Sequence, residues 1–140
     1  MRFRRSGPGI GFTEFVAQRS GALFRTAYAL TGDVHVAEDL VQEALERACR
    51  HWRKVEVADS PEAYVRKVLV NLANDRWRRL SRSIMAASPV CQHCHERLSA
   101  VVDHILPRLD RPDLSFEPTN LRALCEDCHG AVGHKSLRGV

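Results

Sequence analysis

The chain has 140 residues, of which 44% are hydrophobic and 27% are charged, which suits one ordinary globular domain or two small ones. No apolar run approaches the roughly 18 residues of a membrane span, and the basic N-terminus lacks the apolar core of a secretory signal. We therefore expect a cytoplasmic protein with no membrane partner. The net charge of +4 is concentrated in residues 1–85, which hold fifteen Lys and Arg against ten Asp and Glu. A basic half is a weak indication of nucleic-acid binding, since charge attracts phosphates without specifying a function.

Residues 10–82 follow a basic segment, residues 1–9, that we expect to be disordered. Apolar side chains recur at helical spacing in three stretches, at Phe12–Leu30, Ala37–Trp52 and Tyr64–Trp77. Three amphipathic helices with short connections predict a small, mainly α, three-helix bundle. Cys49 lies on the apolar face of the second stretch, so we expect a buried thiol and not a reactive one.

The bundle sequence resembles region 2 of extracytoplasmic-function sigma-70 factors. The resemblance lies in FTEFVAQRSGALFRTAYALTGD, AEDLVQEALERACRHWRKV and SPEAYVRKVLVNLANDRWRR. In that family the second helix docks on the clamp helices of the RNA polymerase core, and the third helps to open and read the −10 promoter element. The resemblance thus implies DNA and RNA polymerase core as partners. The residues that it places near DNA are Asn71, Asp75, Arg76, Trp77, Arg78 and Arg79.

The basic end of this third helix also has a simpler interpretation. Arginines interleaved with an aromatic side chain suit phosphate contacts and base stacking. Alternatively, Trp77 belongs to the helical core and the arginines form a solvated helix end. A complete sigma factor of this type has a second helical domain that reads the −35 element, and residues 83–140 lack that helical pattern. We therefore do not expect this chain to select promoters as a complete sigma factor does.

Residues 83–90 are rich in small and polar side chains and include Pro89, which predicts a linker. Beyond it, residues 91–140 are too poor in hydrophobic side chains for a conventional core, and a module of this size usually needs a metal ion or disulfides to stabilise it. Two C-x-x-C pairs could bind such an ion, because four thiolates complete the coordination of one tetrahedral structural zinc. In a reducing compartment C-x-x-C pairs favour a metal over disulfides. These ligands are Cys91, Cys94, Cys125 and Cys128.

The residues between the two pairs predict a strand at Ala100–Leu106, ended by Pro107, and a second strand at Leu121–Leu124. A helix is expected to begin near Glu126. Together they predict a small α+β, ββα-metal domain stapled by zinc. In order, the segment contains C-x-x-C, D-H-I-x-P, N-L-x-x-L-C and x-x-C-H. With these four spaced motifs, residues 91–135 resemble an HNH endonuclease domain of the zinc-containing bacterial type.

The resemblance implies a nuclease site. His104 would be the general base that activates water, and Asn120 would orient its loop through hydrogen bonds. Asp103 and His129 would hold a catalytic divalent ion, Mg²⁺, Mn²⁺ or Zn²⁺. An imidazole is well matched to accept a proton near pH 7, and an ion with open positions can stabilise charge on a phosphate. The four-thiolate zinc has no open position, so two different metal ions are implied.

Each of these residues has an alternative role. Asp103 and His104 could form an ordinary exposed pair at a strand end, and His129 could support the zinc site from outside its ligand shell. Asn120 is also a good helix or turn cap. Because the four residues occur together at this spacing, we favour catalytic roles for them.

Three functions fit the whole chain. The first is a metal-dependent HNH endonuclease that hydrolyses DNA phosphodiester bonds, with the helical domain supplying DNA or polymerase contacts. The second is a truncated sigma-like transcription factor that binds RNA polymerase core and −10 promoter DNA, with a structural zinc module. The third is a fusion of two fragments that share no function.

Overall fold

The computed structural model describes residues 9–133, and its chain divides into two compact units. The first contains α1 (Phe12–Thr31) as far as Leu30, α2 (Val34–Arg50), α3 (Trp52–Glu56) and the part of α4 (Pro61–Ala87) that ends at Ala73. The second contains Thr31–Asp33 and the described residues from Asn74 onward. The predicted disordered segment, residues 1–9, lies outside the described residues except for Gly9. None of the described helices is both long and apolar enough to cross a membrane.

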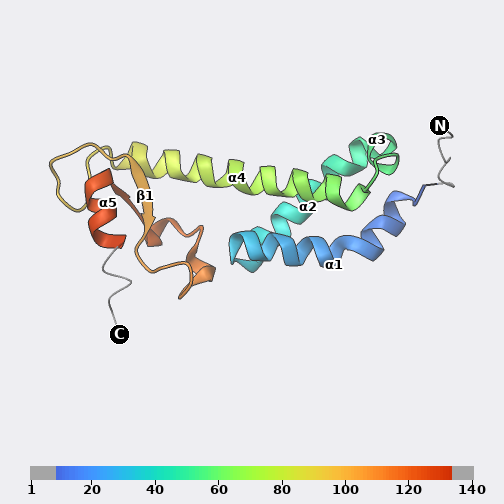
Figure 1. The fold of residues 1–140 in the computed structure, drawn as a ribbon, viewed down its shortest axis with the longest axis horizontal. Helices are drawn as coiled ribbons and strands as arrows, with labels where there is room; N and C mark the ends of the chain where they lie inside the picture. Colours follow the sequence, from blue (N-terminus) through green and yellow to red (C-terminus); the bar gives the residue numbers. More distant parts are fainter. Residues whose placement is uncertain (1–8, 134–140) are drawn as a thin grey trace. The chain divides into compact units, whose positions relative to one another are not determined.

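The first unit is the predicted helical bundle, with α3 as a short addition (Figure 1). Ser60 caps the N-terminus of α4, since its Oγ accepts a hydrogen bond from the Ala63 N–H at 3.2 Å. Gly32 ends α1 with φ of 69°, a left-handed conformation that favours glycine. Apolar side chains at helical spacing fill the interior. Among the most deeply buried are Leu23, Ala27, Ala37, Leu40, Ala44, Ala48, Val55, Val65 and Leu69.

The prediction that Cys49 is buried is wrong, because its side chain is exposed. The fully buried positions of α2 include Ala37, Ala44 and Ala48, and the apolar face of this helix is narrower than the sequence pattern suggests. A position that follows directly after a buried residue is turned about 100° around the helix axis. The helix also ends at Arg50, so Trp52 begins α3 instead of closing α2.

The predicted linker at residues 83–90 is helical over most of its length, because α4 continues to Ala87. No glycine or proline interrupts the sequence between Pro61 and Pro89, and residues 84–87 are Ile-Met-Ala-Ala, which do not oppose a helix. The helix ends before Pro89, as expected where proline disfavours the helical conformation of the preceding residue. A composition of small side chains therefore did not distinguish a linker from the end of a long helix.

The second unit contains the predicted ββα arrangement. β1 (Val101–His104) pairs antiparallel with β2 (Leu121–Leu124), and α5 (Glu126–Gly133) contacts β1 (Figure 1). Between the strands lie two short 3-10 helices, η1 (Pro112–Leu114) and η2 (Pro118–Asn120). The expected fold class, a helical bundle followed by a small α+β domain, is confirmed. The predicted end of that domain, residues 134–140, lies outside the described residues.

Candidate metal centre and active site

Four cysteine thiols come together in the second unit. Cys91 and Cys94 precede β1, Cys125 follows β2, and Cys128 lies on α5. Their sulfur atoms all lie within 4.8 Å of one another. Sulfur atoms bound at about 2.3 Å to one tetrahedral zinc ion are about 3.8 Å apart, so the cluster fits such an ion with little movement. Cys91 and Cys125 are buried beside Leu124 in a small core. These four residues can hold a metal ion, as predicted.

The thiols differ in how readily they ionise. Burial opposes a charge on Cys91, but backbone groups of Cys94, Cys125 and His93 hydrogen-bond to its sulfur, and the net result is a pKa lowered to about 5. A hydrogen bond with the Cys125 side chain, together with burial, raises the pKa of Cys128 to about 12. Thiolates are the metal-binding form, so an ion entering this cluster must displace protons.

His104 is the last residue of β1, and its imidazole is half-buried. Its Nε2 atom lies 3.0 Å from the carbonyl oxygen of Ser115. A carbonyl oxygen only accepts hydrogen bonds, so in the neutral imidazole the proton is assigned to Nε2. Nδ1 is then the nitrogen with an available lone pair, which is what a proton acceptor requires.

Asn120 holds the segment that directly follows His104. Its side-chain oxygen accepts a hydrogen bond from the Leu106 N–H at 2.8 Å, and its Nδ2 donates to the Leu106 carbonyl at 3.1 Å. The same amide donates to the Leu114 carbonyl at 3.4 Å. The backbone carbonyl of Asn120 accepts from the Ile105 N–H at 2.8 Å. Asn120 is only 5% exposed, so these bonds hold the segment directly after β1 against the end of η2, away from solvent.

Asp103 lies between two basic side chains. Its Oδ2 accepts hydrogen bonds from Nε and Nη2 of Arg122, at 3.2 and 2.9 Å, and the two residues are partners in the register of β1 and β2. Its Oδ1 lies 4.0 Å from Nε2 of His129 on α5. Two atoms bound to one ion at about 2.1 Å are at most about 4.2 Å apart. Asp103 and His129 are therefore within reach of a shared divalent ion.

An open pocket of about 260 Å³ adjoins these groups. A carboxylate, an imidazole and two guanidinium groups are among its lining side chains: Asp103, His104, Arg108 and Arg122. The guanidinium groups favour an anionic ligand such as a phosphate, and the imidazole and carboxylate are the groups expected to act on it. The pocket brings together two of the four predicted site residues, Asp103 and His104, with two arginines that were not predicted.

Trp77 also contacts this region, from the part of α4 that belongs to the same unit. Its indole stacks on the imidazole of His104, with ring centroids 5.2 Å apart and an interplanar angle of 12°. Phe116 meets the indole edge-on, with centroids 5.8 Å apart and an angle of 84°. The alternative that Trp77 belongs to the core of the helical bundle is wrong, because its aromatic contacts are with residues of the second unit.

The other α4 residues predicted to lie near DNA point mainly to solvent. Asn71, Asp75, Arg78 and Arg79 are exposed, and Arg76 is partly exposed. Nη1 of Arg78 lies 3.6 Å from Oδ1 of Asp75, and an exposed pair of this kind contributes little to stability. Their proximity to DNA stays a prediction.

Sequence reasoning missed Arg122, Ser115 and the contact between Trp77 and His104. The position of Arg122 could have been found by pairing the two short strands, because an antiparallel register places it opposite Asp103. Ser115 contributes a backbone oxygen, which no side-chain pattern records. The contact between Trp77 and His104 joins two elements that are distant in the sequence, so no local pattern indicates it.

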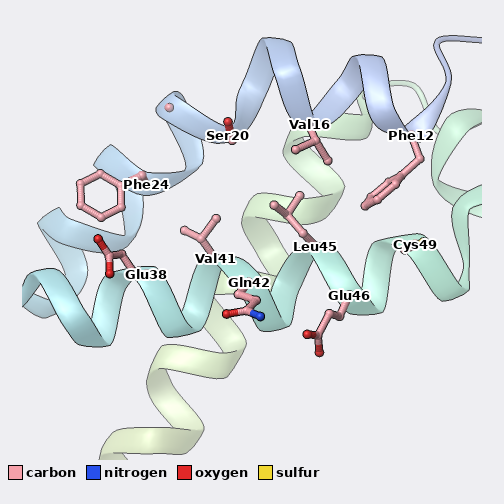
Figure 2. A pocket seen from close by; sticks show the side chains of 11 residues that line it. Phe12, Val16, Ser20, Phe24, Glu38, Val41, Gln42, Leu45, Glu46 and Cys49 are labelled. Carbon is pink, nitrogen blue, oxygen red and sulfur yellow. The ribbon is translucent and has the colours of Figure 1, made fainter.

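The first unit carries a surface groove between α1 and α2, with a volume of about 710 Å³. Figure 2 shows Phe12 and Val16 of α1 on one side, and Val41 and Leu45 of α2 on the other. Cys49 also lines this groove, which explains why an apolar position of α2 is exposed. Apolar grooves on a protein surface are suited to docking a partner's side chains.

Comparison with known families assigns both parts of the chain. Residues 15–83 match the family model of sigma-70 region 2, and residues 91–135 match the family model of the HNH endonuclease. Both resemblances seen in the sequence are thereby confirmed. The chain joins a sigma-70 region 2 segment to an HNH segment.

Individual relatives are sigma factors. The chain is 38% identical over 72 residues to the RNA polymerase sigma-E factor of Streptomyces coelicolor. The aligned stretch covers 51% of this chain and 41% of that protein. It is 36% identical over 76 residues to the ECF RNA polymerase sigma factor SigE of Mycolicibacterium smegmatis, covering 54% of this chain and 29% of that protein. The match thus spans less than half the length of each of these relatives. No solved structure matches the chain significantly.

Proposed function

We propose that the second unit is a metal-dependent endonuclease that hydrolyses phosphodiester bonds in DNA. The observation that carries this proposal is the arrangement around His104: Nε2 is engaged by the Ser115 carbonyl, which leaves Nδ1 to accept a proton, and the neighbouring Asp103 lies 4.0 Å from His129. The match of residues 91–135 to the HNH endonuclease model supports it. Such an enzyme would act on DNA in the cytoplasm.

The residues divide the chemistry among themselves. Nδ1 of His104 removes a proton from the attacking water, which needs a nitrogen with a free lone pair. Asp103 and His129 would hold a divalent ion, and the chemistry that such an ion would supply is stabilisation of negative charge on the phosphate. Asn120 acts by holding the chain after His104. Arg122 adds a positive charge beside the pocket and orients the Asp103 carboxylate.

The four cysteines serve a different purpose in this proposal. We assign them a structural zinc ion, because four thiolates complete its tetrahedral coordination and leave no position for a substrate. The unit has few buried apolar side chains of its own, among them Leu121, Ala123 and Leu124. A metal ion that joins the segments before β1 and after β2 would stabilise a module too small for a conventional core.

Cleavage of supercoiled plasmid DNA tests the proposal. Protein isolated with its thiolate-bound metal should cut only after Mg²⁺, Mn²⁺ or Zn²⁺ is added. An Asp103→Asn variant should need a roughly tenfold or higher ion concentration for half-maximal cleavage, because it loses one anionic ligand. Gel electrophoresis over an ion titration measures both. A wild-type protein that leaves the plasmid intact with all three ions would rule out the nuclease.

A second candidate function is binding to RNA polymerase core. It is favoured by the sigma-factor relatives and by the apolar groove beside α2, the helix that docks on the polymerase clamp in the resembled family. Co-elution of the chain with purified polymerase core in gel filtration tests it. The two functions are compatible, since binding would involve the first unit and cleavage the second. A chain that neither cleaves DNA nor binds polymerase core would be a fusion of two fragments without a shared function.

A further inference from the structure

The imidazole of His104 is restrained by three contacts, of which two were not expected from the sequence. The segment that follows His104 is held by Asn120 through two hydrogen bonds to Leu106. Its Nε2 atom is held by the Ser115 carbonyl at 3.0 Å. Its ring plane lies nearly parallel to the indole of Trp77, at 12°. Each contact restricts a different motion. The Asn120 bonds restrict the backbone after His104, the Ser115 carbonyl fixes the direction of Nε2, and the indole limits the tilt of the imidazole ring.

Trp77 is itself in contact with a second aromatic side chain. Phe116 meets it at 84° in the edge-to-face geometry that aromatic pairs prefer. Phe116 directly follows Ser115, whose carbonyl accepts the hydrogen bond from His104. One loop therefore positions both the indole and the imidazole, and the indole covers one face of the imidazole.

We propose that Trp77 is a positioning residue for His104: stacking by the indole holds the imidazole in the tilt at which Nε2 reaches the Ser115 carbonyl and Nδ1 is left to accept a proton. This inference rests on the proposed nuclease function. It gives a residue of the sigma region 2 segment a role in the HNH site. A general base must be aligned within about 1 Å of its productive position, and misplacement on that scale costs about 100-fold in rate.

The role differs from the one that the sigma-factor resemblance implies for Trp77. A tryptophan that stacks on DNA bases contributes to binding, so its removal raises KM. A tryptophan that orients the general base contributes after the DNA is bound, so its removal lowers kcat and leaves KM nearly unchanged. The two roles therefore predict different kinetic effects of the same substitution: a higher KM for base stacking, and a lower kcat for positioning of the general base.

The test compares Trp77→Leu with Trp77→Phe in the full chain. Leucine removes the aromatic face, and we expect kcat for plasmid cleavage to fall about 10- to 100-fold while KM changes less than about 2-fold. Phenylalanine keeps a smaller aromatic face and should restore most of the lost kcat. Trp52→Phe is the matched control, since Trp52 is the only other tryptophan and packs against Phe12 and Phe15 in the first unit; it should leave kcat unchanged.

A second measurement does not depend on activity. Carbon-bound protons of an imidazole that stacks on an indole experience its ring current, so their NMR signals shift upfield. The His104 signals should show this shift in the wild-type protein and in Trp52→Phe, lose it in Trp77→Leu, and retain part of it in Trp77→Phe. If Trp77→Leu does not fold, the comparison of wild type with Trp77→Phe still reports the contact.

The outcomes separate this inference from the nuclease proposal. Unshifted His104 signals in the wild type, an unchanged kcat in Trp77→Leu, or a raised KM with an unchanged kcat would each overturn the positioning role while leaving the nuclease intact. A wild-type protein that shows the ring-current shift but cleaves no DNA with Mg²⁺, Mn²⁺ or Zn²⁺ would overturn the nuclease, and the positioning role with it.

Discussion

Replacing His104 with alanine is expected to lower the rate of DNA cleavage by about 100- to 10,000-fold, the usual contribution of a general base. The loss follows from the geometry, because Nδ1 is the proton acceptor once Nε2 is engaged by the Ser115 carbonyl. The fold should survive, since the side chain is only partly buried and its hydrogen bond is with a single loop carbonyl, that of Ser115. Plasmid nicking at saturating divalent ion measures the rate.

His35→Ala is the matched control for this substitution. His35 is an exposed histidine of α2, a helix outside the second unit, and its removal should leave the rate unchanged. Equal rates for the wild type, the control and His104→Ala would show that another group removes the proton. Asp103 would then be the next candidate, because it lines the same pocket.

Replacing Cys91 with serine is expected to remove the metal ion and to unfold the ββα module. Structural zinc binding contributes about 10–16 kcal/mol of apparent free energy in small zinc peptides at neutral pH, far more than the few buried apolar side chains of this unit can supply. Cys91 is fully buried next to Leu124 and Cys125, and a serine hydroxyl is a poor zinc ligand there. The helices of the first unit should stay folded.

Mass spectrometry under native conditions gives the metal content, and NMR reports which residues lose their dispersed signals. We expect one tightly bound ion in the wild type and none in Cys91→Ser. Cys49→Ser serves as the control, because Cys49 is exposed and lies outside the cluster of four thiols. A Cys91→Ser protein that keeps both the ion and the dispersed signals of β1 and β2 would contradict a four-thiolate structural site.

The helices of the first unit were largely predictable because their signals are local. Apolar side chains recur at helical spacing, Pro61 stands at the first position of α4, and Gly32 ends α1 with a positive φ. The errors lie where burial depends on neighbours in space. Cys49 has an apolar position in the pattern, yet the groove between α1 and α2 leaves it exposed.

The boundary between the two parts shows a similar limit. The family matches end at residue 83 and begin at residue 91, close to the predicted domains of residues 10–82 and 91–140. The compact units instead divide between Ala73 and Asn74, inside α4. A long helix can supply side chains to two units, and composition alone does not indicate where one ends. The division into domains therefore stays a prediction, and a fragment limited to the predicted second domain, residues 91–140, would lack Trp77.

The sequence by itself determined the order of the elements and the candidate ligands, because helical spacing, paired cysteines and short motifs are properties of neighbouring residues. Only the tertiary structure decided which atoms meet. Arg122 reaches Asp103 from 19 residues away, the Ser115 carbonyl selects Nε2 of His104 from 11 residues away, and Trp77 stacks on the same imidazole from another element. Such contacts depend on strand register, on backbone atoms and on how α4 packs within its unit, none of which is encoded at one position of the chain.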